Sequence, residues 1–228
     1  MNLIYFPLGV LPSLIWLLFY LREDVKPEPK KLVIKVFILG MLFAFPAALF
    51  EFFILRETSK LKFPQILNSI LANFLIIALI EETAKYLVVK KEVLKSSELD
   101  EPIDLMLYMI ISALGFAATE NVLLAFSKEK YLEILVGRFL SATFLHALCS
   151  GILGYFLALS FLTQEKKKIF LFSGFFTAIF LHGLYNFSII EVEGDLKFSI
   201  IGIILIFSAV FVRFCFQRLK KIKSICKI

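Results

Sequence analysis

Ionisable and amide side chains occur inside some of the most apolar stretches of this sequence, where lipid would otherwise surround them. In chain order they are Glu81, Glu82, Lys85, Glu120, His146, His182 and Asn186. A glutamate that faces a wet membrane cavity can take a proton from water as a general base. Histidine and asparagine side chains can stabilise the oxyanion of a tetrahedral intermediate. These residue types therefore predict a catalytic site that activates water.

The same residues offer a second chemistry, in which a metal ion takes part. His146, His182 and Glu120 could bind zinc and leave the fourth position to water, with another glutamate as base. Zinc proteases typically carry H-E-x-x-H on one helix, and the sequence lacks that motif. Ligands from separate helices remain compatible with it. A zinc site and a site without metal are thus equal alternatives.

The cost of burying charge supports a shared site. A charged residue at the centre of a membrane helix costs roughly 2.5–3.5 kcal/mol, so four isolated charges would cost on the order of 10 kcal/mol. Lys85 follows Glu81 by four residues and Glu82 by three, so it can neutralise one carboxylate along the same helix face. Two adjacent glutamates exceed what a structural ion pair needs, which favours a catalytic role.

The elements that must position these residues are membrane helices. Of the 228 residues, 60% are hydrophobic, whereas soluble domains are usually about 45–50% apolar. The excess lies in blocks long enough to cross roughly 30 Å of hydrocarbon as helices. We therefore predict an all-α, polytopic transmembrane helix bundle. The seven expected spans are residues 2–21, 32–55, 65–90, 103–127, 132–163, 169–190 and 197–216.

The fifth block is too long for one upright span. It can tilt, or it can begin as an interfacial turn around residues 131–138, which would give eight helices instead of seven. No linker or repeat divides the chain, so residues 1–228 are expected to form a single integral membrane domain. The catalytic core is expected at about 65–190. A count of helical rise places Glu120 and both histidines at similar depths, and it places the glutamate pair nearer to the cytoplasm unless the third helix continues past Lys91.

Small residues share helix faces with the two histidines. The fifth and sixth spans repeat a small or polar residue every four positions: Ala142, His146, Ser150 and Gly154 in one, and Gly174, Ala178, His182 and Asn186 in the other. A four-residue repeat stacks along one helix face, and small residues there allow helices to approach closely. Both histidines are therefore expected inside the bundle. Glu51, near a span end, is expected to extend toward the interface.

The net charge of +6 arises from lysines and arginines in the short links, where they act as topology signals and lipid contacts and do not indicate nucleic-acid binding. Most of them fall on one side of a seven-span protein. The positive-inside rule then predicts an outside N-terminus and a cytoplasmic C-terminus in the cell membrane. The expected partners are the lipid bilayer and a membrane substrate.

Four motifs in a fixed order resemble those of a known family. They are E-E-x-x-K from Glu81, F-x-x-x-E from Phe116, then His146, and H-x-x-x-N from His182. This ordered set is similar to the PrsW family of intramembrane proteases, which groups with type II CAAX prenyl proteases and bacteriocin-processing proteins. The CAAX proteases carry arginine and histidine where this chain has Tyr86 and Glu120. The departure favours the PrsW branch over a prenylated substrate.

The resemblance implies site-1 cleavage of a single-pass membrane protein, the type case being an anti-sigma factor. It implies that one glutamate of the adjacent pair activates water, and that His146, His182 and Asn186 polarise the scissile carbonyl or hold a metal. Glu120 would support the site and Lys85 would fix the glutamate pair. PrsW proteins are classed as metalloproteases, whereas the CAAX relatives have been interpreted as glutamate-dependent without metal.

Two other functions use the same residue types. A proton-coupled transporter also carries ionisable residues at mid-depth, but it predicts inverted repeats with broken helices, and the sequence shows no repeat. A non-catalytic scaffold would use the histidines for assembly and would tolerate Glu82→Gln. The protease hypothesis predicts instead that Glu82→Gln folds but cannot cleave.

Overall fold

Helices form every regular element of the part of the chain that the computed structural model describes, residues 5–24, 26–125 and 131–222. The elements are α1 (Tyr5–Leu21), α2 (Lys30–Thr58), α3 (Gln65–Ile70), the π-helix η1 (Leu71–Ala78), α4 (Leu79–Glu92), α5 (Pro102–Ala125), α6 (Tyr131–Leu140), α7 (Ala142–Leu162), the 3₁₀ turn η2 (Gln164–Lys166), α8 (Lys167–Glu191) and α9 (Gly194–Leu219). The expected first-span start at residue 2 and fourth-span end at 127 lie outside the described residues.

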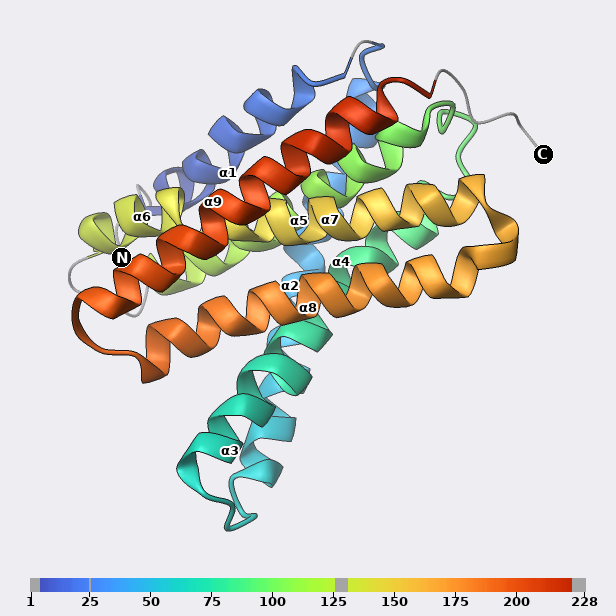
Figure 1. The fold of residues 1–228 in the computed structure, drawn as a ribbon. Coiled ribbons are helices and arrows are strands. Elements are labelled where there is room, and N and C mark those ends of the chain that lie inside the picture. The colour runs from blue at the N-terminus through green and yellow to red at the C-terminus, as the bar shows by residue number, and fades with distance from the viewer. Residues whose placement is uncertain (1–4, 25, 126–130, 223–228) are drawn as a thin grey trace.

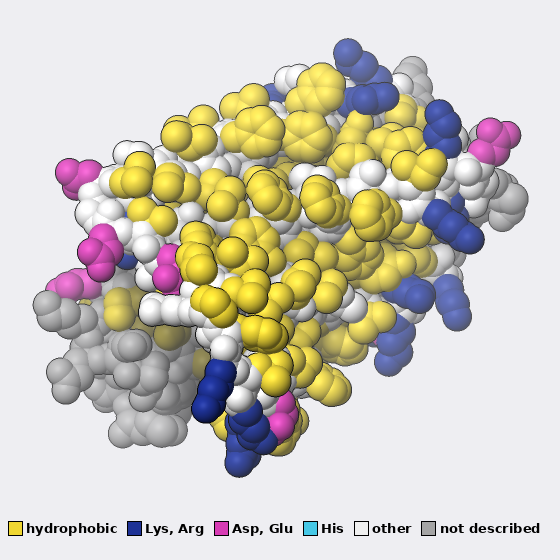
Figure 2. All heavy atoms as spheres, turned by 60° about the horizontal axis from the view of Figure 1, so that its bottom comes forward, with side chains coloured by type: hydrophobic (Ala, Val, Ile, Leu, Met, Phe, Trp, Pro, Cys, Tyr) yellow, Lys and Arg dark blue, Asp and Glu magenta, His cyan; other side chains and the backbone are white. Residues whose placement is uncertain are grey.

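The helices have the length and composition of membrane spans. Within the described residues, six helical segments are long and apolar enough to cross a membrane: 30–58, 65–92, 102–124, 131–162, 164–191 and 194–219. The remaining apolar helix, α1, has 17 residues, which is near the lower limit for a span. Figure 2 shows a broad apolar surface with charged side chains mostly at its edges. The predicted all-α polytopic bundle is confirmed.

Helix α5 forms the centre of the bundle. It packs against α1, α2, α4 and α7, and its residues from Pro102 to Thr119 are all buried. Gly40 of α2 and Gly115 of α5 allow a close crossing, because a Cβ on either glycine would collide with the backbone of the other helix. The end of α2 and the start of the α3–η1–α4 rod project together from one side of the bundle (Figure 1). Glu120 follows directly on this buried stretch of α5, so the packed helix fixes its position.

Of the two alternatives for the fifth block, a single tilted helix or a broken one, the structure has the broken one. Ser141 leaves helical geometry, with φ −121° and ψ −83°, and separates α6 from α7. With 10 residues, α6 rises about 15 Å and cannot span the bilayer by itself. The break allows α6 to approach the bundle at a different angle from α7. It thereby places Arg138 beside the residues of α5.

The third span contains the π-helix η1, which the sequence did not predict. π-helical turns inside α-helices occur frequently at functional sites. Gly183 of α8 packs directly on this segment, since a Cβ there would lie 2.6 Å from the Phe74 ring. The faces of small residues on α7 and α8 are likewise helix contacts: Gly154 packs on α5, and Gly174 packs on α7. The prediction that both histidines lie inside the bundle is confirmed, because each is under 5% exposed.

Glu28 is a half-buried carboxyl in the link between α1 and α2, outside the spans. The hydroxyl of Tyr108 donates a hydrogen bond to Glu28 Oε2 over 2.6 Å. Burial raises the pKa of Glu28 to about 8; this hydrogen bond opposes the rise and the charge of Asp104 reinforces it. The folded protein therefore holds the Glu28 proton more tightly than the unfolded chain does.

This raised pKa predicts a pH-dependent stability. Because the folded state binds the proton more tightly, the contribution of Glu28 is full below its ordinary pKa of 4.5 and is lost as the pH rises toward about 8. Glu28→Gln cannot ionise and keeps an acceptor for Tyr108. Its thermal unfolding midpoint in detergent should therefore exceed that of the wild type at alkaline pH and approach it under acid conditions. Glu98→Gln, at an exposed position, is the control, and parallel pH profiles for Glu28→Gln and wild type would refute the assignment.

Candidate active site

A buried lysine connects the two adjacent glutamates of α4 to a histidine of α7. Lys85 Nζ donates to Glu82 Oε1 over 2.7 Å and to Glu81 Oε2 over 3.2 Å. It also lies 2.7 Å from His146 Nδ1. The side chain of Lys85 is fully buried, and its ammonium lies over the Phe116 ring, 4.8 Å from the centroid. The predicted pairing along one face of the helix is confirmed.

Glu82 is contacted by three hydrogen-bond donors. Besides Lys85, its Oε1 faces His182 Nδ1 at 3.0 Å, and its Oε2 accepts a bond from Ser150 Oγ over 2.7 Å. Glu82 is fully buried and does not line the cavity described below. Its carboxylate therefore joins α4, α7 and α8 and has no face on the cavity.

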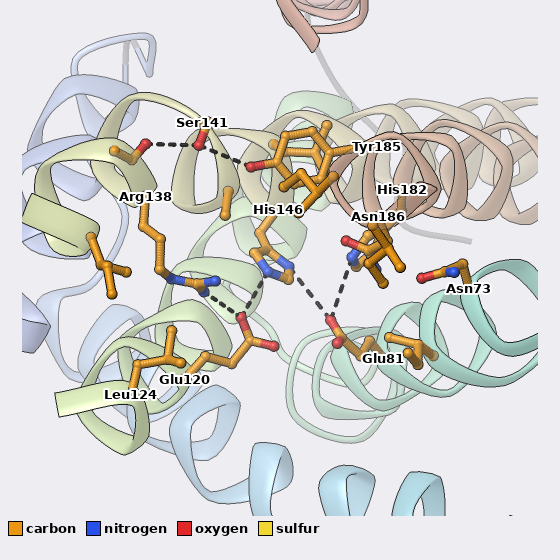
Figure 3. Close-up of a pocket in the computed structure, with 17 residues that line it drawn as sticks. Asn73, Glu81, Glu120, Leu124, Arg138, Ser141, His146, His182, Tyr185 and Asn186 are labelled. Atoms are coloured by element: carbon orange, nitrogen blue, oxygen red, sulfur yellow. Dashed lines mark hydrogen bonds and ion pairs between the residues drawn. The ribbon is translucent and has the colours of Figure 1, made fainter. Parts of the chain in front are cut away.

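Glu81 faces a cavity instead. Its Oε2 lies 3.6 Å from His146 Nδ1 and 3.7 Å from His182 Nε2, and Figure 3 shows the carboxylate directed at both rings. The count of helical rise separated the glutamate pair from the histidines. The contact removes this separation, because a count along straight, upright helices ignores how the helices tilt and cross.

Glu120 forms the other edge of the site. Its Oε2 lies 3.0 Å from His146 Nε2 and accepts a hydrogen bond from Arg138 over 2.8 Å. Arg138 also donates from Nε to Asn121 Oδ1 over 2.6 Å, and Asn121 donates to Thr143 over 3.1 Å. Helix α6 thus holds the carboxylate of α5 against the imidazole of α7.

The hydrogen-bond partners of His146 and His182 indicate which ring nitrogen carries the proton in each. Because an ammonium only donates, His146 Nδ1 accepts from Lys85, and its Nε2–H donates to Glu120. Glu82 accepts from Lys85 and also from His182 Nδ1, so Nδ1 carries the proton of His182. The Nε2 of His182 then holds a free lone pair on the side of Glu81. In each ring, the hydrogen bond at one nitrogen sets which nitrogen carries the proton.

The cavity beside these residues has a volume of about 450 Å³, within the range of small ligand sites. Glu81, Glu120, His146 and His182 line it, together with Arg138, Tyr185, Asn186 and Asn73. Its remaining walls are largely apolar, from residues such as Ile77, Leu145 and Ile189. Tyr185 donates to Ser141 Oγ over 2.9 Å at its rim. An apolar cleft with a few convergent polar groups suits a hydrophobic peptide segment.

The donor set fits a zinc ion in type. Among the described residues, Glu81, His146 and His182 each offer an atom, and these atoms lie within 4.8 Å of one another. Two imidazoles and one carboxylate are a known ligand set of catalytic zinc. This group contains Glu81 where the sequence suggested Glu120 as the carboxylate ligand. His146 would have to release Lys85 or Glu120 to offer a nitrogen, whereas His182 Nε2 is already free.

The structure brings together all seven residues that the sequence singled out, but in different roles. Glu82 and Lys85 lie beneath the cavity, and the other five line it. Sequence reasoning missed Arg138, Ser150 and Asn73. A signal existed for Asn73, since an amide is unusual in an apolar span and Asn73 precedes Glu81 by eight residues, two helical turns.

Glu51 was assigned to the interface. It is half-buried, its Oε1 is shielded from solvent, and no described residue donates a hydrogen bond to that atom. Its charge interacts with those of Glu120 and Lys85. One carboxylate oxygen of Glu51 is thus turned away from solvent, and the extension of this side chain toward the membrane interface stays a prediction.

Comparison with known proteins agrees with this geometry. A sequence model of the family described as "PrsW family intramembrane metalloprotease" matches residues 28–214. A protein named Protease PrsW from Geobacillus kaustophilus is 31% identical over 186 residues, which cover 81% of this chain and 79% of the relative. The Protease PrsW of Bacillus subtilis is 27% identical over 181 residues, which cover 78% of this chain and 79% of the relative. No solved structure matches.

Proposed function

Because this chain belongs to the PrsW family of intramembrane metalloproteases and is thus a membrane protease, we propose that it hydrolyses a peptide bond of a single-pass membrane protein with water activated by Glu81. The substrate class is that of site-1 cleavage, for which an anti-sigma factor is the type case. The region from about 65 to 190 serves as its catalytic core. The N-terminus lies outside and the C-terminus lies in the cytoplasm.

One observation supports this proposal above the others. Of the two adjacent glutamates, only Glu81 lines the cavity, and its Oε2 faces both histidine rings. Glu82 is engaged by Lys85, Ser150 and His182. A general base must reach its water within hydrogen-bond distance, so Glu81 takes that role and Glu82 holds the neighbouring side chains in place.

The reaction follows from these positions. Glu81 takes a proton from a water in the cavity, and the hydroxide oxygen bonds to the scissile carbonyl carbon. The oxyanion accepts a hydrogen bond from the amide of Asn186. It also accepts from guanidinium N–H groups of Arg138, which has five N–H donors and uses only some of them on Glu120 and Asn121. Glu81 then returns its proton to the leaving amine as the C–N bond breaks. Lys85 stabilises the carboxylate whenever it is ionised.

The same residues could also bind a metal ion. Glu81, His146 and His182 would hold it, and bound zinc would supply Lewis-acid polarisation and lower the pKa of its water. Since Glu81 would then be a ligand, Glu120, the other carboxylate that lines the cavity, would accept the proton. The His182 Nε2 lone pair and the ligand types support this form, and the Lys85 contact to His146 supports the form without metal.

Cleavage by the purified protein in proteoliposomes tests the function. A panel of single-pass proteins, including an anti-sigma factor, is reconstituted with the full chain, and products are followed by gel and mass spectrometry. We expect a cut that depends on Glu81. A chelator arm, with zinc added back, separates the two forms: loss and recovery of cleavage indicate metal, and unchanged cleavage indicates glutamate alone. If no member of the panel is cleaved, the proposed substrate class is wrong.

A further inference from the structure

Asn73 is a buried amide whose carboxamide oxygen has no hydrogen-bond donor among the described residues. It is 1% exposed and lies in η1, two turns before Glu81 on the same rod. Its Nδ2 donates to the Ser69 carbonyl over 2.8 Å and to Ser69 Oγ over 3.2 Å. Among the described residues none donates to Oδ1, although buried polar atoms nearly always have a partner.

The two bonds to Ser69 fix the orientation of the amide. Because an N–H must face the carbonyl of Ser69, the nitrogen points back along the rod and the oxygen points the other way. Asn73 lines the cavity together with Ile77 and Glu81, at spacings of four and eight residues that keep all three on one helix face. Figure 3 shows its oxygen directed toward Asn186 and Glu81.

An unwound membrane segment carries donors of the kind that the Asn73 oxygen lacks. A transmembrane helix must unwind locally before its peptide bond can be attacked, and each N–H released in this way lacks a partner in an apolar environment. Most acceptors in the cavity wall already have a part in the reaction or a partner: Glu81 and Glu120 belong to the proposed chemistry, His182 Nε2 faces Glu81, and Ser141 Oγ accepts from Tyr185. The oxygen of Asn73 is a neutral acceptor close to them.

We propose that Asn73 Oδ1 accepts a hydrogen bond from a backbone N–H of the unwound substrate and so sets the register of the scissile bond over Glu81. This inference rests on the proposed peptidase function. The eight residues from Asn73 to Glu81 span at most about 12 Å of helix, and an extended substrate advances about 3.3 Å per residue. The N–H that Asn73 accepts therefore lies within about four residues of the cleaved bond.

Ester analogues of a substrate test this contact. The probe is a synthetic single-pass peptide of about 20 apolar residues with a fluorophore and a quencher, reconstituted with the full chain in proteoliposomes. Each analogue replaces one backbone N–H by an ester oxygen. With the wild type, we expect one analogue within four residues of the cut to show a KM about three- to tenfold higher, the effect of one neutral hydrogen bond, with kcat less affected.

The Asn73→Ser variant identifies the partner of that N–H. A serine hydroxyl can keep the bond to the carbonyl four residues earlier, but its oxygen lies nearer to the backbone and does not reach the position of Asn73 Oδ1. We expect its KM for the parent peptide to rise by a similar factor, and the difference between parent and sensitive ester to disappear. Asn68→Ser is the matched control, since Asn68 also donates to a backbone carbonyl, that of Phe63 at 3.1 Å, and does not line the cavity.

The possible outcomes distinguish failure of the Asn73 contact from failure of the proposed peptidase function. If Asn73→Ser keeps the same ester sensitivity as the wild type, or lowers only kcat and thermal stability, the contact is structural or made to water, and the inference is overturned. If the wild type does not cleave the parent peptide, the proposed function fails. Fluorescence binding of parent and ester peptides to Glu81→Gln, with and without Asn73→Ser, then still decides the contact. A peptide that is neither bound nor cleaved overturns both.

Discussion

Replacing Glu81 by glutamine is expected to slow peptide cleavage at least about 100-fold, the lower range of what a general base contributes. Glutamine has the same shape and keeps an oxygen near Lys85, so the fold and the unfolding midpoint should change little. The measurement is the initial cleavage rate of a reconstituted single-pass substrate, normalised to folded protein. The loss follows from the position of Glu81 at the cavity beside both imidazoles.

Glu82→Gln is the matched control for this prediction. It removes the charge that holds Lys85 and His182, so we expect a larger fall in stability than in Glu81→Gln and a smaller fall in the rate per folded molecule. Notably, sequence reasoning alone expected Glu82→Gln to be the inactive variant. A Glu81→Gln protein that cleaves at the wild-type rate would contradict the catalytic assignment.

Replacing Lys85 by methionine is expected to cause the largest loss of stability in the molecule. The substitution keeps a long apolar side chain but leaves two carboxylates buried without their cation, and removing one partner of a buried ion pair typically costs about 3–5 kcal/mol. The free energy of unfolding in detergent micelles measures the effect. The double variant Glu82→Gln/Lys85→Met removes one of the stranded charges and should recover part of the loss without recovering activity.

An exposed ion pair provides the comparison for Lys85. Lys60 pairs with Glu57 at 2.6 Å with the same spacing of three residues as Lys85 and Glu82, but both partners are more than 60% exposed. Exposed pairs contribute about 0–1 kcal/mol, so Lys60→Met should be close to neutral. Equal losses from Lys60→Met and Lys85→Met would show that the buried cation does not hold the site together.

The sequence predicted the helices and the site residues for physical reasons that are local. Twenty-residue apolar blocks permit only helices in lipid, and ionisable residues inside them are too costly to lack a purpose. The spacing of Glu81, Glu82 and Lys85 along one helix was enough to predict their ion pairs. Seven residues of the candidate site could therefore be named before any tertiary contact was known, although Arg138 was not among them.

The roles within the site depend on tertiary contacts that spacing does not encode. Neighbouring positions on a helix point about 100° apart, so only the packing of α7 and α8 decides that Glu82 turns inward and Glu81 faces the cavity. Arg138 reaches Glu120 because the chain breaks at Ser141. Ser150 looked like one small residue among several until its hydroxyl was found on Glu82.

The central claim is that Glu81 directs water onto a peptide bond within the membrane. Cleavage of a reconstituted single-pass peptide in ¹⁸O-labelled water, analysed by mass spectrometry, tests it most directly. We predict that the wild type cuts within the apolar segment and places one ¹⁸O atom in the new carboxyl group, and that Glu81→Gln in matched liposomes yields almost no labelled product. The same labelled product formed at the same rate by Glu81→Gln would contradict the claim.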